Sequence, residues 1–476
     1  MIRLDDVSFA FPGAARREFL RGITLAIGDG EWVAVAGGNG SGKTTLCRLL
    51  AGIYRPSAGA VTVDGTDPAR VDVDSRRAPA IGIAFQNPDS QFVTSSVERE
   101  LVFGLENLRT DRHEMTSRLA AAARLFSIER YLARNPHALS GGEKQRLVLA
   151  CLWAMGPRHL ILDEPFSFLD APSREAFLEA LRGSFRREGK TIIWSTVDAE
   201  ELMLADRVIF MDGGEVRFDG APGDIARSIP ALDLDRSLVR RDVSVGVRGA
   251  PSPHARPRDA APVVEMRGAR FSPGGNAFTL DVSSFSGAAF ERVGICGPSG
   301  SGKTTLLLGS AGLLPPRSGD VALFGARVRS RRDFPAGRVA FLFQSPEEGF
   351  FAPTVREEIA LACRNLAGSG DPSDAAARSL TDVGLSPELF LDRNPFHLSQ
   401  GEKRLVALAS VLVLDARLFL LDEPTIFLDG AARRRLLSAL DRLSARGATT
   451  VVASHDRSFL GECTDRIVAL EHGRLL

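Results

Sequence analysis

An internal repeat is the feature that most constrains how this chain can fold. The stretch GGNGSGKTT begins at Gly37 and recurs as GPSGSGKTT from Gly297, and four further motifs recur in the same order. The spacing between the copies hardly varies: it is 258 residues from Gln86 to Gln344 and 260 residues from Lys43 to Lys303. This regularity predicts a tandem duplication of one whole domain.

A segment without apolar periodicity separates the two copies. It reads VRGAPSPHARPRDAAP (247–262) and is rich in Pro, Ala and Arg, a composition typical of linkers. We therefore expect one domain over 1–238, a linker over 239–261 and a second domain over 262–476. With 476 residues, the chain is long enough for each domain to bury its own core.

Each copy has the pattern of an α/β domain. The runs EWVAVAG and RVGICG are short, apolar and end in Gly-rich turns, which favours buried parallel strands that lead into helices. The runs HLILD and LFLLD indicate further buried strands, each ending in a carboxylate. In such sheets ligands bind at the carboxyl ends of the strands, so the motifs found there form the candidate site.

The Gly-rich segments fit the pattern GxxxxGK[ST] in both copies. Glycine permits backbone conformations and close approaches that side chains would block. Backbone N–H groups and the N-terminus of the following helix can then surround phosphate groups, while the lysine contacts the β- and γ-phosphates and the threonine binds Mg²⁺. The predicted ATP-binding residues of the two loops are Gly37, Gly38, Asn39, Gly40, Ser41, Gly42, Lys43, Thr44 and Thr45, and Gly297, Pro298, Ser299, Gly300, Ser301, Gly302, Lys303, Thr304 and Thr305.

An acidic pair ends an apolar strand in each copy. The pairs are Asp163 with Glu164 and Asp422 with Glu423. The aspartate would hold Mg²⁺ through water, and the glutamate would orient or deprotonate the attacking water. Such a string alone is more often a strand end with a solvated acid. Its position downstream of a phosphate loop favours the catalytic interpretation.

The segments LSGGE (139–143) and LSQGE (398–402) complete the set of motifs. With the phosphate loops, the acidic strand ends and the loops FSFLD and TIFLD, they resemble the ATP-binding cassette family over nearly the whole chain. The resemblance implies two tandem P-loop nucleotide-binding domains, each with a mixed sheet core and a helical signature subdomain. It also implies head-to-tail packing, with ATP between the phosphate loop of one domain and the signature of the other, so that both sites form within one chain.

The same resemblance assigns the signature residues. In the family, the serine and the second glycine face the γ-phosphate at a helix N-terminus, which suits an anion. By itself LSGGE also fits a helix cap, with Ser140 at the N-cap and Glu143 three residues later. The positions that match the family signature are Ser140, Gly141 and Gly142 in the first copy and Ser399, Gln400 and Gly401 in the second.

Two further pairs of residues match family positions. Gln86 and Gln344 match the glutamine that takes part in catalysis and in Mg²⁺ binding. Phe11 and Phe271 stand where the family places an aromatic ring that stacks on adenine. Taken singly, such phenylalanines are more often core or edge-strand residues, and this alternative stays open from the sequence.

The two copies differ at one position of a repeated segment, TIIWSTVD against TTVVASHD. His455 matches the family's switch histidine, whereas Val197 can neither donate nor accept a hydrogen bond. One predicted composite site combines Val197 with the altered signature that contains Gln400, and the other combines His455 with the intact signature. Losing such a donor typically costs about 3 kcal/mol, or roughly 10²-fold in rate.

We therefore expect the site with His455 to perform most of the hydrolysis and the site with Val197 mainly to hold ATP. The alternative is that Val197 is an ordinary residue at the end of a strand. The first site would then tolerate it, since Glu164 is retained there.

The stretch FQNPDSQFVTSSVERELVFGLENL (85–108) closely resembles ATPases of energy-coupling factor importers, which take up vitamins, cobalt and nickel. The resemblance implies a transmembrane coupling protein and a small substrate-capture membrane protein as partners. It places the chain peripherally at the cytoplasmic face of the cell membrane. Phe92, Phe350 and Phe351 lie in polar, loop-like surroundings, and we expect them to line grooves for helices of the partner. Packing into their own helical subdomain is the alternative.

Three other functional classes are weighed against this one. A twin-cassette ATPase of a sugar importer has a similar length, but the FQNPDSQF segment disfavours it. A ribosome-associated twin-cassette factor normally has a long, charged interdomain segment, whereas the expected linker is short and Pro-rich. A DNA-repair cassette protein would need a long coiled coil or zinc cysteines between its motifs.

The composition argues against several further classes of function and of cellular location. Net charge is zero, with 59 basic and 59 acidic residues, which argues against a nucleic-acid partner that is bound through a strongly basic field. The five cysteines show no CxxC spacing, which fits a reducing compartment. The longest apolar stretch, LVALASVLVL (405–414), is shorter than the roughly 18 residues that span a bilayer, so we expect a membrane role only through a partner.

Overall fold

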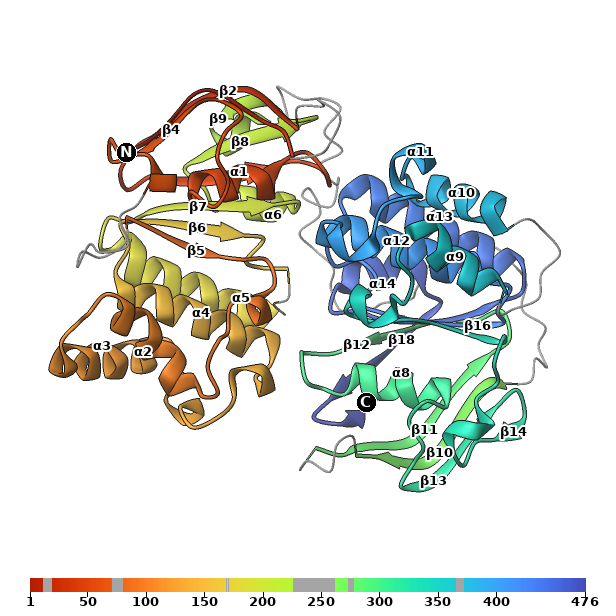
Figure 1. Cartoon of the computed structure of the whole chain (residues 1–476). Coiled ribbons are helices and arrows are strands. Elements are labelled where there is room, and N and C mark those ends of the chain that lie inside the picture. Colours follow the sequence, from red (N-terminus) through yellow and green to blue (C-terminus); the bar gives the residue numbers. More distant parts are fainter. Residues whose placement is uncertain are drawn as a thin grey trace. The chain divides into compact units, whose positions relative to one another are not determined.

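The computed structural model divides into two compact units, residues 1–241 and 242–476 (Figure 1). Each unit is described by itself. The structure describes residues 1–11, 19–70, 80–167, 169, 171–225, 262–272, 278–364 and 372–476, so the predicted linker over 239–261 lies outside the described residues.

Unit 1 contains two sheets. Strands β1 (Ile2–Phe9), β2 (Leu20–Ile27) and β4 (Ala58–Val63) form an antiparallel sheet in the order β2-β1-β4. The second sheet has the order β5-β6-β7-β3-β8-β9, and only its last pair is antiparallel. Its strands are β3 (Trp32–Ala36), β5 (Ile81–Ala84), β6 (His159–Asp163), β7 (Thr191–Thr196), β8 (Arg207–Asp212) and β9 (Glu215–Gly220).

The helices of unit 1 cover this second sheet on both faces. Helix α1 (Lys43–Leu50) packs with the antiparallel sheet in one hydrophobic core, and the helices that follow β5 share a second core (Figure 1). These later helices are α2 (Val97–Asn107), α3 (Arg112–Leu125), α4 (Gly141–Met155), α5 (Ala171–Ala180) and α6 (Ala199–Leu202). The predicted sheet core and helical signature subdomain are therefore present.

Unit 2 repeats this plan, with its strands joined into a single sheet of order β14-β13-β10-β11-β19-β18-β12-β17-β16-β15. The antiparallel part contains β10 (Pro262–Phe271), β11 (Leu280–Ala288), β13 (Ser318–Leu323) and β14 (Ala326–Arg327), and β18 (Arg466–Glu471) pairs antiparallel with β19 (Arg474–Leu475). The parallel part contains β12 (Arg292–Cys296), β15 (Val339–Leu342), β16 (Leu418–Asp422), β17 (Thr449–Ala453) and β18.

The helices of unit 2 also follow the first copy. Helix α8 (Lys303–Ala311) packs in one core with the antiparallel strands, and the later helices pack in another. These are α9 (Val355–Arg364), α10 (Pro372–Val383), α11 (Pro387–Phe390), α12 (Gln400–Leu412), α13 (Gly430–Ala445) and α14 (Arg457–Cys463).

The central strands explain why both copies fold in this way. All five residues of β3, β6, β12 and β16 are buried, as expected for parallel strands that are covered on both faces. The apolar runs that predicted strands are these strands, and the acidic residues end β6 and β16. The α/β fold expected from the sequence is confirmed, and the motifs gather at the carboxyl ends of the parallel strands.

Candidate functional site

The phosphate loop of unit 1 joins β3 to α1 and depends on glycine at defined points. Gly37 and Gly42 have φ angles of +153° and +107°, in the region that favours glycine. A Cβ atom on Gly37 would lie 2.3 Å from the carbonyl oxygen of Met211. The ammonium group of Lys43 donates hydrogen bonds to the carbonyls of Gly37 and Gly38, at 2.9 and 3.0 Å. The loop therefore holds the lysine over its own backbone, where the predicted phosphate site lies.

The loop of unit 2 has the same construction between β12 and α8. Gly302 has a φ angle of +108° and precedes the helix. The ammonium group of Lys303 donates to the carbonyls of Gly297 and Pro298, at 2.8 and 3.2 Å. The buried hydroxyl of Ser301, like that of Ser41 in the first loop, has no hydrogen-bond partner among the described residues. Orphaned polar groups of this kind suit a site that binds a polar ligand.

Two of the three predicted Mg²⁺ ligands meet in each unit, the threonine and the aspartate, whereas the Gln86 amide binds Glu164 and Gln344 is exposed. The hydroxyl of Thr44 donates to Asp163 at 3.1 Å, and that of Thr304 donates to Asp422 at 2.6 Å. Hydroxyl and carboxylate oxygens are the hard donors that Mg²⁺ prefers. Burial raises the pKa of Asp422 to about 6, which a nearby cation would offset. The residues present therefore fit a magnesium ion.

The acid of unit 1, Glu164, is buried, and its carboxylate accepts hydrogen bonds from neutral side chains. The side-chain amide of Gln86 donates to its carboxylate at 2.6 Å, and the hydroxyl of Ser167 donates at 3.3 Å. The hydroxyl of Ser195 accepts from the backbone N–H of Glu164 at 2.9 Å and donates to Asp163 at 2.5 Å. Burial raises the pKa of Glu164 above its usual range, although the charge of Lys43 acts in the opposite direction.

The acid of unit 2, Glu423, is held by cationic groups instead. Nδ1 of His455 lies 2.9 Å from its carboxylate, and the ammonium group of Lys303 lies 3.4 Å away. Although burial opposes it, the contact with His455 lowers the pKa of Glu423, and the same contact raises the pKa of His455 against its burial. Glu423 is therefore kept as a carboxylate. Gln344 is exposed. Among the described residues, Gln344 makes no bond to Glu423 that corresponds to the bond between Gln86 and Glu164.

The strand register confirms that Val197 and His455 are equivalent positions. Asp163 pairs with Ser195 across β6 and β7, and Asp422 pairs with Ala453 across β16 and β17. Val197 and His455 each stand two residues beyond these partners. The two sites therefore differ in an imidazole: His455 provides one beside Glu423, and Val197 provides none at the same place in unit 1.

The signature segments begin helices α4 and α12, and both carry the capping box expected from the sequence. The carboxylate of Glu143 accepts from the N–H of Ser140 at 2.8 Å, and Glu402 accepts from Ser399 at the same distance. A Cβ atom on Gly142 would lie 2.7 Å from the hydroxyl of Ser173, so a larger residue would be crowded there. The helix-cap interpretation is thus confirmed, and the role toward ATP stays a prediction.

One predicted adenine contact is wrong. Phe271 is fully buried, and it pairs with Leu280 as Phe9 pairs with Leu20, so its structural counterpart is Phe9. Its ring fills the core against Gly309 and is not available for stacking. Phe11 is 39% exposed and packs edge-on against Phe9, so it remains a candidate in unit 1.

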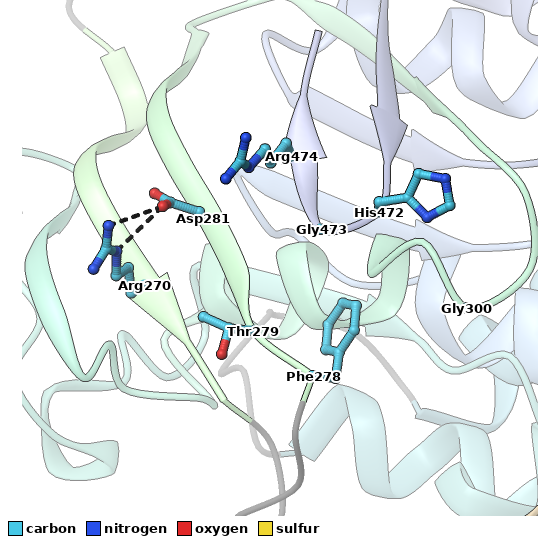
Figure 2. Close-up of a pocket in the computed structure, with 8 residues that line it drawn as sticks. All are labelled: Arg270, Phe278, Thr279, Asp281, Gly300, His472, Gly473 and Arg474. Carbon is cyan, nitrogen blue, oxygen red and sulfur yellow. Dashed lines mark hydrogen bonds and ion pairs between the residues drawn. The ribbon is translucent and has the colours of Figure 1, made fainter.

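The sequence interpretation missed Phe278, which is half-buried beside the second phosphate loop. It lines a pocket of about 450 Å³ between the start of β11, the β18–β19 turn and Gly300 (Figure 2). Arg270 and Asp281 form an ion pair at 3.1 Å on the far side of this pocket, and His472 lies opposite them. The sequence did hold one signal for Phe278, since it is an aromatic residue just before an apolar strand. In the structure it lies beside the loop that precedes α8.

Two of the three phenylalanines expected to line partner grooves are in fact buried. Phe92 and Phe350 are 8% and 5% exposed and belong to the cores of their own helical subdomains. The residues that follow them are the exposed ones: Val93 is 64% exposed and Phe351 is 76% exposed. The backbone conformation of the turn decides which of two successive residues faces solvent. The sequence pattern did not reveal it.

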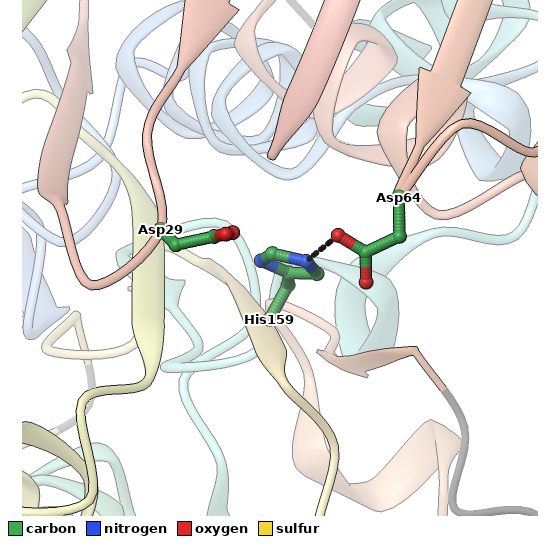
Figure 3. Close-up of side chains that lie close together, drawn as sticks. All are labelled: Asp29, Asp64 and His159. Atoms are coloured by element: carbon green, nitrogen blue, oxygen red, sulfur yellow. Dashed lines mark hydrogen bonds and ion pairs between the residues drawn. The ribbon is translucent and has the colours of Figure 1, made fainter.

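A cluster of Asp29, Asp64 and His159 lies at the other end of the strands, since His159 begins β6 and Asp163 ends it (Figure 3). The amino group of Met1 lies 2.7 Å from Asp64, and the guanidinium of Arg158 lies 3.1 Å from the same carboxylate. Cations of the chain itself therefore balance the acids, and we assign this cluster a structural role.

Within the described parts of the chain, none of the helices combines the length and apolarity that a membrane span requires. The chain matches the family model described as "ABC transporter" twice, over residues 20–167 and 280–426.

Related proteins match over nearly the whole chain. A Bifidobacterium longum protein named as an ABC transporter ATP-binding protein is 32% identical over 98% of this chain and 64% of its own length. A Bacillus subtilis protein named as an HMP/thiamine import ATP-binding protein is 28% identical over 99% of this chain and 90% of its own.

A solved structure of ribosome-bound archaeal Pelota and ABCE1 aligns with a TM-score of 0.69, at 24% identity over 96% of this chain and 76% of the other, which shows a shared fold. The two matches to the family model cover more than half of the sequence. The chain therefore belongs to the ABC transporter family, as a tandem pair of its ATP-hydrolysing domains.

Proposed function

We propose that this chain is the ATP-hydrolysing subunit of an energy-coupling factor importer for a vitamin or a transition-metal ion such as cobalt or nickel. Unit 2 carries the main hydrolytic acid, and unit 1 mainly holds ATP. The chain works at the cytoplasmic face of the membrane, with a transmembrane coupling protein and a small substrate-capture protein as partners. The pairing of each phosphate loop with the signature of the other unit is part of this proposal.

The observation that carries the asymmetry is the 2.9 Å contact between His455 and Glu423. An ionised glutamate accepts a proton from water and orients it, whereas a protonated one does neither. His455 and Lys303 keep Glu423 ionised. The Glu164 carboxylate accepts hydrogen bonds from the neutral side chains of Gln86 and Ser167, and the charge of Lys43 does not offset the effect of its burial. The feature that favours unit 2 is therefore an acid that is held ionised and in place by its contact with His455.

The other residues of unit 2 bind and position the substrate. The loop N–H groups and Lys303 neutralise the β- and γ-phosphates, and His455 lies beside the acid, where it can donate to the charge that develops on the γ-phosphate. Thr304 and Asp422 would hold Mg²⁺, which supplies further charge neutralisation when it is bound. Each of these groups is fixed by a strand end or a helix start.

The test compares Glu423→Gln with Glu164→Gln in the full chain. We expect Glu423→Gln to lower the rate of phosphate release by about 10²- to 10³-fold, because a charged group at the reacting centre is lost. Glu164→Gln should lower it only a few-fold. Binding of a fluorescent ATP analogue serves as the control for an intact site. The opposite ranking of the two variants would refute the assignment.

The name of the Bacillus subtilis relative supports the importer half of the proposal, because HMP/thiamine import is uptake of a vitamin or its precursor. The alignment with the ribosome-bound complex carries the fold alone. A sugar-type importer is the runner-up, and it would differ in the membrane partner that is captured.

The exposed residues Val93 and Phe351 support a partner surface. They occupy matching places after Gln86 and Gln344, the glutamines of the two Q-loops, and each stands beside a phenylalanine that anchors the turn in the core. Apolar side chains exposed at the same place in both units suit apolar helix ends of a membrane protein.

The double variant Val93→Ser with Phe351→Ser should therefore lose membrane partners in a pull-down from detergent-solubilised host membranes and should still bind ATP. Met203→Ser is the matched control, since Met203 is 61% exposed elsewhere in unit 1. Capture of a sugar-type permease with a binding protein would favour the runner-up. Undiminished capture by the double variant would reject this surface.

A further inference from the structure

An arginine is buried beneath the hydrolytic site of unit 2. Arg404, in the second turn of α12, is 0% exposed, and burial lowers its pKa to about 10. An ionised group in such a place is costly unless every donor is satisfied. The contacts of Arg404 must therefore be accounted for.

Its guanidinium donates to five backbone carbonyls from two neighbouring strand ends. On the β15 side, Nη1 donates to Phe343 at 2.6 Å and to Gln344 at 3.2 Å. On the β16 side, Nη2 donates to Asp422 at 2.7 Å and to Glu423, and Nε donates to Pro424 at 3.4 Å. One side chain thus ties the Q-loop glutamine and both acidic residues to the signature helix.

The carbonyl of Glu423 belongs to an unusual backbone turn. Glu423 has a φ angle of +46°, a left-handed conformation that is unfavourable for a side chain of this type. A donor that fixes this carbonyl also fixes the direction in which the carboxylate leaves the backbone. Lysine, with three donors on one atom, could not reproduce the planar fork that spans two strand ends.

Unit 1 lacks this device. Gln145 stands at the same place in α4, and its buried amide nitrogen has no hydrogen-bond partner among the described residues. Glu164 nevertheless has nearly the same backbone conformation, with a φ angle of +45°. The arginine is therefore not required to form the turn, and it belongs to the unit whose acid is ionised.

We propose that Arg404 is a positioning residue that holds Glu423 and Gln344 in register with the signature helix, and so sets the turnover rate of the unit 2 site. This inference rests on the proposed function of that site. Arg404 touches no reacting group, so its effect is on kcat, through the placement of Glu423.

The test uses the full chain with Glu164→Gln, so that unit 2 supplies the measured turnover. Arg404→Gln, which copies the residue of unit 1, and Arg404→Lys should each lower kcat about tenfold or more. The affinity for a fluorescent ATP analogue should stay within about twofold. Arg378→Gln, at an exposed position of α10, is the matched control with unchanged kcat. All rates are measured below the lowest melting temperature of the set.

Three outcomes are decisive. Loss of kcat in both Arg404 variants with retained ATP affinity supports the proposal. Unchanged kcat in Arg404→Gln overturns it, and full kcat in Arg404→Lys overturns the role of the guanidinium fork. Glu423→Gln is measured beside them: if it leaves turnover intact, the proposed function of unit 2 fails, independently of Arg404.

Discussion

Units 1 and 2 share one backbone plan and differ in how they hold the same acid. The Glu164 carboxylate accepts hydrogen bonds from the amide of Gln86 and the hydroxyl of Ser167, whereas that of Glu423 lies against His455 and Lys303. The consequence is opposite pKa shifts in equivalent places, upward for Glu164 and downward for Glu423. The comparison teaches that duplication can preserve a site's geometry while a few neighbouring side chains decide the direction in which the pKa of its acid is shifted.

The test with the largest expected effect is a substitution that makes unit 2 resemble unit 1. His455→Val removes the cationic partner of Glu423, and we expect a roughly 10²-fold lower rate of phosphate release, since a preorganised donor is worth about 3 kcal/mol. ATP affinity should change little, because the phosphate loop is untouched. A His455→Val protein with near-normal turnover would show that the two acids do not need different neighbours.

The next test separates the two phenylalanines of unit 2. Phe271→Ala should lower the free energy of unfolding by about 3–5 kcal/mol, because it leaves a cavity in a closed core. Phe278→Ala should leave stability nearly unchanged and weaken binding of a fluorescent ATP analogue by up to about tenfold, the value of a lost aromatic contact. Weaker binding in a stable Phe271→Ala protein, with none in Phe278→Ala, would restore the original assignment.

A third test uses pH. Glu201 of unit 1 is buried beside Thr196 and Asp198, and burial raises its pKa to about 8. A raised pKa means that its contribution to stability is present at low pH and is lost as pH rises from the ordinary value of 4.5 toward 8. Unit 2 has Phe459 at this position.

We therefore expect Glu201→Gln to raise the melting temperature of unit 1 more at pH 8.5 than at pH 5.5, by a few degrees, because glutamine has no charge to bury. Differential scanning calorimetry at the two pH values measures the change. An equal shift at both values would mean that Glu201 is not the group that titrates.

The smallest expected effect comes from the reverse exchange, Val197→His. The strand register places the new imidazole two residues beyond the partner of Asp163, so it can approach Glu164. Because Gln86 already occupies that carboxylate at 2.6 Å, we expect only a few-fold gain in turnover, measured in the Glu423→Gln background. A loss of turnover there would indicate that Gln86 and an imidazole cannot share the acid.

The sequence predicted the fold and the local geometry of the phosphate loops and acidic strand ends, because glycine, lysine and acidic residues have strict backbone or charge requirements. The loops around Lys43 and Lys303 and the strand ends at Asp163 and Asp422 could be placed from pattern alone. The absence of an imidazole at Val197 was visible in the same way, since it needs only an alignment of the two copies.

Aromatic positions were less predictable. Phe271 was misplaced because it was matched to Phe11, which lies beyond the end of β1, whereas the strand pairing makes it the counterpart of Phe9 inside the strand. Phe92 and Phe350 were misplaced by one residue for a different reason: the turn they belong to packs one side chain inward and exposes the next. Arg404 was missed because its importance lies in backbone carbonyls, which carry no residue-type signal.

The joining of the two units in one polypeptide has a consequence for the amounts of the two units that the cell makes. Separate genes for two unlike ATPases would need matched expression, and any imbalance would favour assemblies with two copies of the same half. One reading frame yields both units in equal number from every round of translation. The two unlike units are therefore always produced together, whatever the expression level.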